Sequence, residues 1–171
     1  MSAPIRDHRH WRAASYAEAA VTTEKTTMTT PIIAGFYPDP SICQVGDVNY
    51  IANSSFEYVS GVPIHRSTDL VTRTLVGNAL RRPSQLDLTS APASIGVFAP
   101  TLRHHGDRFW LVTTNALEIQ RGQLIVTAED PAGPWSDPVH VDGAVGIDPE
   151  SSFLLRLEDS ERPRWRNACG Y

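Results

Sequence analysis

Residues 40–52 read PSICQVGDVNYIA, and residues 100–112 read PTLRHHGDRFWLV. With an offset of 60 residues, from Pro40 to Pro100, the two stretches share a leading proline, a central Gly-Asp pair and an apolar run after it. A Gly-Asp pair between two runs of β-forming residues indicates a β-hairpin, because the turn needs residues that tolerate a positive φ. The sequence therefore predicts the same strand–turn–strand unit twice.

The repeat continues beyond the two hairpins. The same offset places Ser67-Thr68-Asp69 over Thr127-Ala128-Glu129, so a second strand pair, ending in an acidic turn, follows each hairpin. Four short antiparallel strands that recur at a fixed period are typical of a β-propeller blade. A β-sandwich with evenly spaced hairpins is the alternative. Both readings predict an all-β fold over residues 30–149.

Composition excludes several classes of function. The 171 residues are 41% hydrophobic and 20% charged, which suits one globular domain. Fifteen Lys and Arg against 19 Asp and Glu give a net charge of -4, so we expect neither a nucleic-acid partner nor a membrane partner. No apolar stretch approaches the roughly 18 residues of a membrane-spanning helix, and charged residues interrupt the first 20 positions. These features predict a cytoplasmic protein.

The two cysteines, Cys43 and Cys169, are too few for a disulfide framework and lack the spacing of a zinc site. We expect both to be thiols, with Cys43 buried. The sequence calls for no cofactor and no metal.

Residues 1–27 and 150–171 differ in composition and sequence pattern from residues 28–149. Residues 1–27 are rich in Ala and Thr without helical or strand periodicity, which predicts a poorly ordered leader, and Met28 could be a natural start. Residues 28–149 carry the repeat. A third unit begins at Asp148-Pro149, but residues 150–171 lack the Gly-Asp turn that is due there. We expect this tail to reflect a changed reading frame or a truncated gene.

Asp39 and Asp148 each precede a proline at the start of a predicted inner strand. The residue before proline favours extended backbone geometry, so we expect both carboxylates at one mouth of the channel, in one shared pocket. Acidic groups that converge in a pocket can serve general acid and base catalysis. For either residue taken alone, an ordinary Asp-Pro turn is the favoured explanation.

Several stretches occur in the order of a known family. The chain resembles glycoside hydrolase family 43, the β-xylosidases and α-L-arabinofuranosidases, over about residues 30–149. The stretches that carry the resemblance are PIIAGFYPDPSIC (31–43), NSSFEY (53–58), GVPIHRSTDL (61–70), RRPSQLDL (81–88), FAPTLR (98–103), TAEDPAGPWSDPV (127–139) and GIDP (146–149).

The resemblance implies a five-bladed β-propeller. Five blades at roughly 60 residues each need about 300 residues, so we expect about two blades and the start of a third here. It also implies an inverting mechanism, with Asp39 as general base and Asp148 as the carboxylate that orients the general acid and raises its pKa. The acid itself would be a Glu on a later blade. No candidate is found, because Glu150, Glu158 and Glu161 lie in or beside the tail.

Other residues have two readings each. Phe56 matches an aromatic residue that lines the family's sugar subsite. Packing in the hydrophobic core is an equally plausible role for Phe56. Phe98 stands beside that subsite, where the family more often has Trp or Tyr. Gln85 or Asp87 could approach substrate, although loop structure also explains them. We interpret His65, His104 and His105 as solvated strand positions and not as metal ligands, since neighbouring residues on a strand point to opposite faces.

Two functions follow from these observations. The first is an inverting glycosidase that acts on xylan or arabinoxylan oligosaccharides, with a pentose oligosaccharide as its partner. The alternative is a catalytically inactive remnant or a weak carbohydrate-binding fragment, because no general acid is identified. Self-association through the exposed edge of the last sheet is possible in either case.

Overall fold

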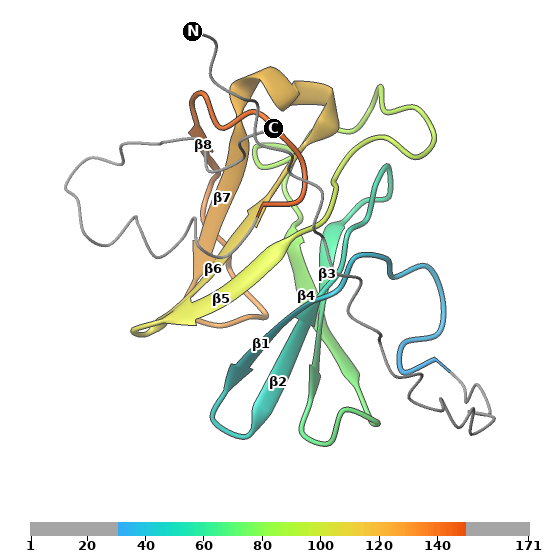
Figure 1. Cartoon of the computed structure of the whole chain (residues 1–171), viewed down its shortest axis with the longest axis vertical. Coiled ribbons are helices and arrows are strands. Elements are labelled where there is room, and N and C mark those ends of the chain that lie inside the picture. Colours follow the sequence, from blue (N-terminus) through green and yellow to red (C-terminus); the bar gives the residue numbers. More distant parts are fainter. Residues whose placement is uncertain (1–30, 150–171) are drawn as a thin grey trace, which may run out of the picture.

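The structure is a computed structural model that describes residues 31–149. These residues form two four-stranded antiparallel sheets with the strands in sequence order (Figure 1). The first sheet contains β1 (Ser41–Val45), β2 (Val48–Ala52), β3 (Gly61–Ser67) and β4 (Thr74–Leu80). The second contains β5 (Thr101–His105), β6 (Arg108–Thr113), β7 (Gln123–Ala128) and β8 (Val139–Val141). The two predicted four-stranded units are confirmed. The predicted leader 1–27 and tail 150–171 lie outside the described residues.

Both Gly-Asp pairs form the hairpin turns that the repeat predicts. In each hairpin the ladder closes on the residues directly before and after the Gly-Asp pair. Gly46 has φ of 56° and Gly106 has φ of 61°, the left-handed geometry of a two-residue turn. The local turn chemistry thus determines where β1 and β5 end and where β2 and β6 begin.

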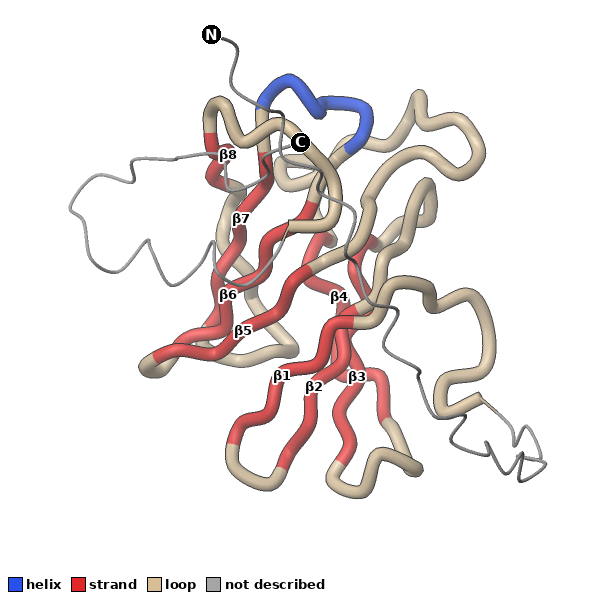
Figure 2. The backbone as a smooth tube through the Cα atoms, viewed as in Figure 1, coloured by secondary structure: helices blue, strands red, loops and turns tan. Residues whose placement is uncertain are grey.

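The connection between β6 and β7 contains a short helical element within an otherwise β structure, as the expected almost wholly β fold allows. Residues Ala116–Arg121 form a short 3-10 helix, η1. Asn115 caps it, because its side chain accepts a hydrogen bond from the amide of Leu117 at 3.2 Å. Figure 2 shows this helix in blue beyond the end of the second sheet. Within residues 31–149 no helix has the length and apolar character needed to cross a membrane.

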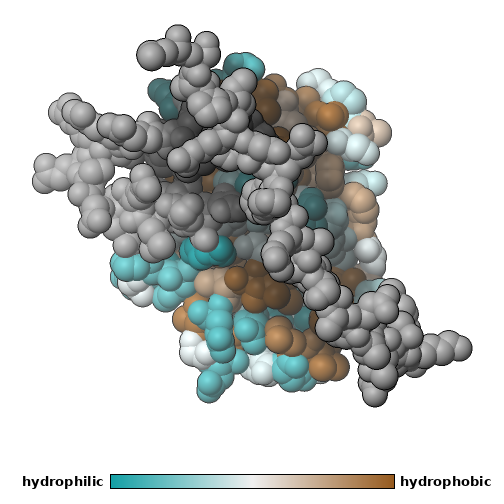
Figure 3. Space-filling view, viewed as in Figure 1, coloured by the Kyte–Doolittle hydropathy of each residue, from teal (hydrophilic) through white to brown (hydrophobic). Residues whose placement is uncertain are grey.

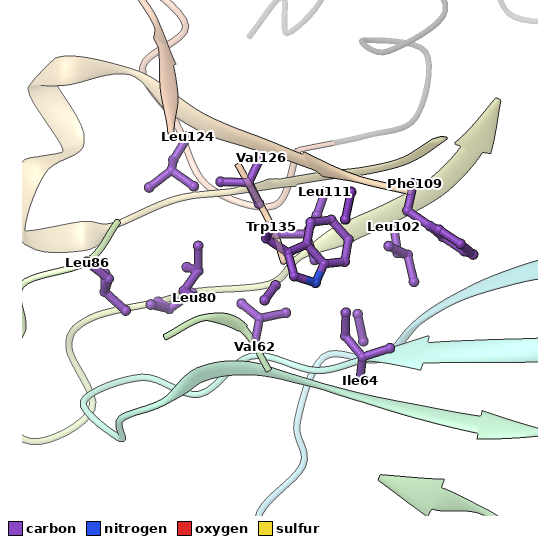
Figure 4. Packing of buried hydrophobic residues seen from close by; sticks show 14 of the residues in the cluster. Val62, Ile64, Leu80, Leu86, Leu102, Phe109, Leu111, Leu124, Val126 and Trp135 are labelled. Atoms are coloured by element: carbon purple, nitrogen blue, oxygen red, sulfur yellow. The ribbon is translucent and has the colours of Figure 1, made fainter. Parts of the chain in front are cut away.

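The hydrophobic core lies between the facing sides of the two sheets. Tyr50 of β2 and Phe109 of β6 meet edge to face with ring centroids 5.1 Å apart. Figure 4 shows aliphatic side chains of the two sheets pointing toward one another. Burial of one such side chain contributes about 1.5–3 kcal/mol to stability. Labelled members are Val62, Ile64, Leu80, Leu102, Leu111, Leu124 and Val126, together with Leu86 from the segment after β4.

Trp135 fills the space between these side chains. It belongs to the loop between β7 and β8, residues 129–138, which we call the tryptophan loop. The indole N–H donates to the carbonyl of Pro131 at 3.2 Å, so its polar atom is satisfied inside the loop (Figure 4). Gln85, beyond β4, donates to the carbonyl of Ser136 at 2.7 Å, and Arg82 pairs with Asp137 at 2.6 Å. The loop is therefore fixed to the first sheet although it grows from the second.

A second connection joins the sheets beyond the ends of β2 and β6. Val97 exchanges two backbone hydrogen bonds with Phe56, of 2.9 and 3.0 Å, and bridges Asn115 on its other side. Gly96 precedes it with φ of 141°, and a Cβ at this position would lie 2.2 Å from the carbonyl oxygen of Phe56. We call residues 96–98 the Val97 link. Only glycine permits the close approach on which the link depends.

One row of side chains on the face of the first sheet that points away from the core is mostly apolar. Strand register aligns Ile42, Ile51, His65 and Leu75 in one cross-strand row. Ile51 and His65 are each 5% exposed, whereas Ile42 is 54% and Leu75 is 50% exposed. Figure 3 shows apolar surface among hydrophilic surface in the lower part of the view, where Figure 1 places β1–β4. The middle of the row is covered, and its two ends face solvent.

We expect Gly96→Ala to lower the free energy of unfolding by about 3 kcal/mol or more, because the methyl group collides with backbone and the left-handed φ adds strain. Urea unfolding followed by circular dichroism measures this loss. Gly106→Ala is the matched control, since it also has a positive φ but nothing within 4 Å of the new methyl group. It should lose about 1–2 kcal/mol. Equal losses in both variants would contradict the role of the Val97 link.

Candidate active site

Asp39 stands at the corner between the preceding loop and β1. Its carboxylate accepts a hydrogen bond from the Ser54 hydroxyl at 2.7 Å. The backbone beside it is also held, because the carbonyl of Pro38 accepts from the amide of Ser54 at 3.1 Å. The side-chain amide of Asn53 donates to the carbonyls of Tyr37 and Pro38 at 2.8 and 3.1 Å. Residues 37–39, which we call the Asp39 corner, are therefore bonded to Asn53 and Ser54, directly after the end of β2.

Asp148 stands at a second corner, after β8. The carbonyl of Gly146 accepts a hydrogen bond from the buried side-chain amide of Gln123 at 2.8 Å. The carbonyl of Pro149 accepts from the hydroxyl of Thr101, the first residue of β5. These bonds attach the segment 146–149 to the second sheet on both sides of the aspartate.

Both aspartates have left-handed backbone geometry, with φ of 50° at Asp39 and 55° at Asp148. The expectation of extended geometry before proline was wrong for both. Aspartate tolerates this region better than most residues, and the hydrogen bonds around each corner outweigh the preference that the proline imposes. Backbone held in such regions costs about 1–3 kcal/mol and is concentrated at functional sites.

The two corners lie beside the adjacent starts of β1 and β5. The amide of Leu102 donates to the Ser41 hydroxyl at 3.0 Å, so the starts of β1 and β5 are adjacent (Figure 1). Asp39 directly precedes this part of β1, and the Asp148 segment contacts the first residue of β5. Both aspartates are exposed to solvent. That their carboxylates share one pocket stays a prediction.

The predicted aromatic residues lie beside the Asp39 corner. Phe98 belongs to the Val97 link and Phe56 pairs with Val97, and the two ring centroids are 5.6 Å apart. Both are half-buried and neither belongs to the hydrophobic core, which weakens the core-packing reading of Phe56. Phe56 has φ of 47°, a left-handed geometry that is rare for a bulky residue. The link thus presents two phenyl rings beside the Asp39 corner.

Sequence reasoning missed two further aromatic residues. Phe36 lies 5.7 Å from Phe56, and Tyr58 lies 5.5 Å from Phe36, measured between ring centroids. The available signal was their position, since Phe36 stands three residues before Asp39 and Tyr58 two after Phe56. Ser54, the partner of the Asp39 carboxylate, was missed in the same way.

The expectation that His65 is solvated was wrong, because His65 is buried. Its ring meets Tyr37 edge to face with centroids 4.9 Å apart, and its Nδ1 is buried without a hydrogen-bond partner. Burial lowers the pKa of His65 below its ordinary value of 6.5, and the positive charge of Arg73 lowers it further. The neutral ring therefore supports the loop that carries Asp39.

The other predicted polar residues have structural roles. Gln85 is buried and bonds the tryptophan loop, which accounts for its position without substrate, and Asp87 bonds Thr89 at 2.6 Å. His104 is half-buried against Phe109, with ring centroids 4.7 Å apart. Within residues 31–149 no three metal-binding side chains gather in one place.

Cys43 is buried with a free thiol, as predicted, and burial raises its pKa. Cys169 lies outside the described residues.

The glutamates within residues 31–149 all have partners of their own. Glu57 accepts from the amide of Ser94 at 3.0 Å, and the other two form ion pairs, Glu118 with Arg121 at 2.9 Å and Glu129 with Arg108 at 3.0 Å. None of them adds an unengaged carboxylic acid to the two aspartate corners. Glu150, Glu158 and Glu161 lie outside the described residues.

Comparison with known proteins identifies relatives of this chain. The family model described as glycosyl hydrolases family 43 matches residues 28–156. A "Xylosidase/arabinosidase" of Butyrivibrio fibrisolvens is 52% identical over 72% of this chain and 24% of its own length. A "Non-reducing end alpha-L-arabinofuranosidase" of Bacteroides ovatus is 46% identical over 80% of this chain and 26% of its own length. This chain spans about a quarter of the length of these curated relatives.

Among solved structures, the family 43 protein GH43B of the Bacteroides ovatus xyloglucan locus matches with a TM-score of 0.62 and 50% identity. The match covers 65% of this chain and 22% of that chain.

We expect the protein to lose stability on acidification through His65. The pKa of His65 is lowered in the folded chain, so the stabilisation is fully present above the unfolded pKa of 6.5 and is lost as the pH falls from there to the folded pKa. Urea unfolding between pH 8 and about pH 5 measures the effect. His65→Phe keeps a ring against Tyr37 without a titrating group, so its loss should be smaller. The loss of stability that remains in His65→Phe is expected from His140, because burial also lowers the pKa of His140. Equal losses in both proteins would argue against His65.

Proposed function

This chain belongs to glycosyl hydrolases family 43, and from that premise we propose that it supplies two carboxylates and a sugar-binding wall to an inverting xylosidase or arabinofuranosidase. The observation that supports this most directly is the pair of corners. Asp39 and Asp148 share a left-handed backbone, and their segments meet the adjacent starts of β1 and β5. An ordinary Asp-Pro turn does not require this strain twice beside two adjacent strands.

In the proposed reaction Asp39 is the general base. Its carboxylate takes a proton from a water molecule as the water attacks the anomeric carbon from the face opposite the leaving group, and the configuration inverts. Base and acid then stand roughly 6.5–9.5 Å apart, which leaves room for the water. The hydrogen bond from Ser54 to Asp39 Oδ2 fixes one oxygen and leaves Oδ1 for the water. Exposure to solvent keeps Asp39 accessible to water.

Asp148 has an indirect role in this proposal. It orients a general acid, a glutamate supplied from another part of the protein, and its negative charge raises the pKa of that acid. Fixed bonds at Gly146 and Pro149 suit such a role, because an orienting charge must hold its position.

We also propose the complete fold and the substrate from the membership of family 43. The two sheets would be the first blades of a five-bladed propeller, with the corners facing its axis. The substrate would be the non-reducing end of a xylan or arabinoxylan oligosaccharide, whose terminal pentose packs against Phe56 and Phe98. A flat apolar ring suits one face of a sugar, and the carboxylates suit its hydroxyl groups.

A second candidate function is carbohydrate binding without hydrolysis. The observation in its favour is that each glutamate within residues 31–149 already has a hydrogen-bond or ion-pair partner. Under this alternative the aromatic residues and the corners hold a sugar, but nothing within the described part protonates the leaving oxygen.

A charged ligand tests the aspartate pair. A xylose-configured iminosugar carries a positive ring nitrogen that imitates the oxocarbenium-like transition state. We expect Asp39→Asn and Asp148→Asn each to raise its Kd about tenfold in calorimetry at low salt, because each removes one negative charge from the site. Asp47→Asn in the β1–β2 turn removes the same charge elsewhere and should change the Kd by less than about twofold. A Kd unaffected by Asp39→Asn contradicts the proposed site.

Turnover separates the two candidate functions. We expect the purified chain to hydrolyse xylobiose and methyl arabinofuranoside no faster than buffer, because their alkoxide leaving groups must be protonated and a missing general acid forfeits about 10²–10⁴-fold in rate. Release of free xylose or arabinose measures this directly. Hydrolysis that disappears in Asp39→Asn and survives in Asp47→Asn would mean that the chain contains its own acid, and would favour the hydrolase over the binding function.

A further inference from the structure

Three consecutive polar residues at the end of β6 are buried. Thr113, Thr114 and Asn115, which we call the β6 triplet, are 0%, 1% and 3% exposed. Burying a polar side chain costs stability unless the side chain is hydrogen-bonded. The partners of these side chains therefore show what the β6 triplet holds in place.

The β6 triplet holds Phe98, which belongs to the proposed sugar-binding wall. The hydroxyl of Thr113 donates to the carbonyl of Phe98 at 2.9 Å, and the carbonyl of Thr114 accepts from the amide of Phe98 at 3.0 Å. Asn115 bridges Val97, the residue before Phe98. Both backbone polar groups of Phe98 are thus bonded to the triplet.

The β6 triplet also holds the segment 146–149, which we call the Asp148 corner. The hydroxyl of Thr114 lies 3.0 Å from the carbonyl oxygen of Gly146 and 2.8 Å from Oε1 of Gln123, and it can donate its single proton to one of them at a time. Gln123, which is also buried, donates from Nε2 to the same carbonyl at 2.8 Å. The carbonyl of Gly146 is therefore a common acceptor for two buried side chains.

Apolar packing contributes little to the position of the Asp148 corner. Among residues 142–149 only Ala144 is buried. The corner is held by its backbone hydrogen bonds, from Thr101 at Pro149 and from the two buried side chains at Gly146. A displacement of about 1 Å is enough to impair a group that must act at a fixed place in a site.

We propose that Thr114 is a positioning residue for Asp148, acting together with Gln123, and that the β6 triplet thereby keeps the Asp148 carboxylate in place relative to Phe98. This inference rests on the proposed function, in which Asp148 is the orienting carboxylate and Phe98 contacts the terminal sugar. Valine has nearly the shape of threonine and would fill the same space without burying a hydroxyl. The hydroxyl of Thr114 is therefore needed for its contacts and not for its volume.

The test compares a charged and a neutral ligand on variants of the full chain, by calorimetry at low salt. The xylose-configured iminosugar has a positive nitrogen that senses the charge of Asp148, whereas xylose is neutral. Thr114→Val removes the hydroxyl, Thr114→Ser keeps it, and Gln123→Met removes the amide from the same contact. Ser67→Ala is the control, because it also removes a buried hydroxyl, one that accepts from the amide of Leu70 at 2.8 Å at the end of β3. Circular dichroism and thermal melting verify folding.

We expect Thr114→Val and Gln123→Met each to raise the Kd of the iminosugar about threefold to fivefold, because a displaced carboxylate stabilises the positive nitrogen less. The Kd of xylose should change by less than about twofold, and so should both constants in Thr114→Ser and Ser67→Ala. In the Asp148→Asn background Thr114→Val should change the Kd of the iminosugar by less than about 1.5-fold, since the two residues act through one interaction.

Two sets of results would contradict the inference. The positioning role is overturned, and the proposed function left intact, if Thr114→Val has no effect on the iminosugar or weakens both ligands equally. The same holds if it acts equally with and without the Asp148 carboxylate, or if neither Thr114→Val nor Gln123→Met folds, since the contacts then serve folding. An iminosugar Kd that Asp148→Asn leaves unchanged overturns the proposed role of Asp148 together with this inference.

Discussion

The indole of Trp135 has to be enclosed by both sheets, and this requirement fixes how the sheets are placed. Its ring is large and apolar, so exposure to water is unfavourable, while its N–H needs a partner when buried. Pro131 provides that partner within the tryptophan loop, which leaves the whole ring free to contact side chains of the first sheet. The bonds to Gln85 and Arg82 then hold the loop across the gap. A β-hairpin alone is marginally stable, and here the indole joins the aliphatic side chains of both sheets in one common core.

Because the sheets are locked together, their ends converge, and the candidate site is built from those ends. The Val97 link and the bond between Ser41 and Leu102 lie where β1, β2, β5 and β6 begin or end. Asp39, Phe56, Phe98 and Asp148 all belong to segments that leave the sheets at this point. Functional groups on segments anchored at strand ends are positioned by the rigid sheets, yet they stay accessible to a ligand.

The parts of this structure that could be predicted from sequence depend on contacts between residues close in the chain. The hairpins at Gly46 and Gly106 and the order of the strands belong to this class, because turn chemistry and alternation are local. The errors arose where distant segments meet. Tyr37 packs against the ring of His65, and Ser54, Gln123 and Thr101 bond the segments that carry the two left-handed aspartates. Phe36 packs against Phe56 through the same kind of long-range contact, which no local sequence pattern predicts.

The strained corners also have an evolutionary consequence. Three prolines, Pro40, Pro100 and Pro149, open corresponding positions, and the residues before them are Asp39, Ala99 and Asp148. Within residues 31–149 both aspartates have positive φ, whereas Ala99 does not. The architecture therefore tolerates a relaxed corner without a carboxylate at this position. Strain that serves chemistry and not folding persists only under selection for that chemistry. In a lineage without selection for the proposed reaction, substitutions that relax the Asp39 or Asp148 corner would be favoured or neutral, and the two sheets would persist without the proposed catalytic groups.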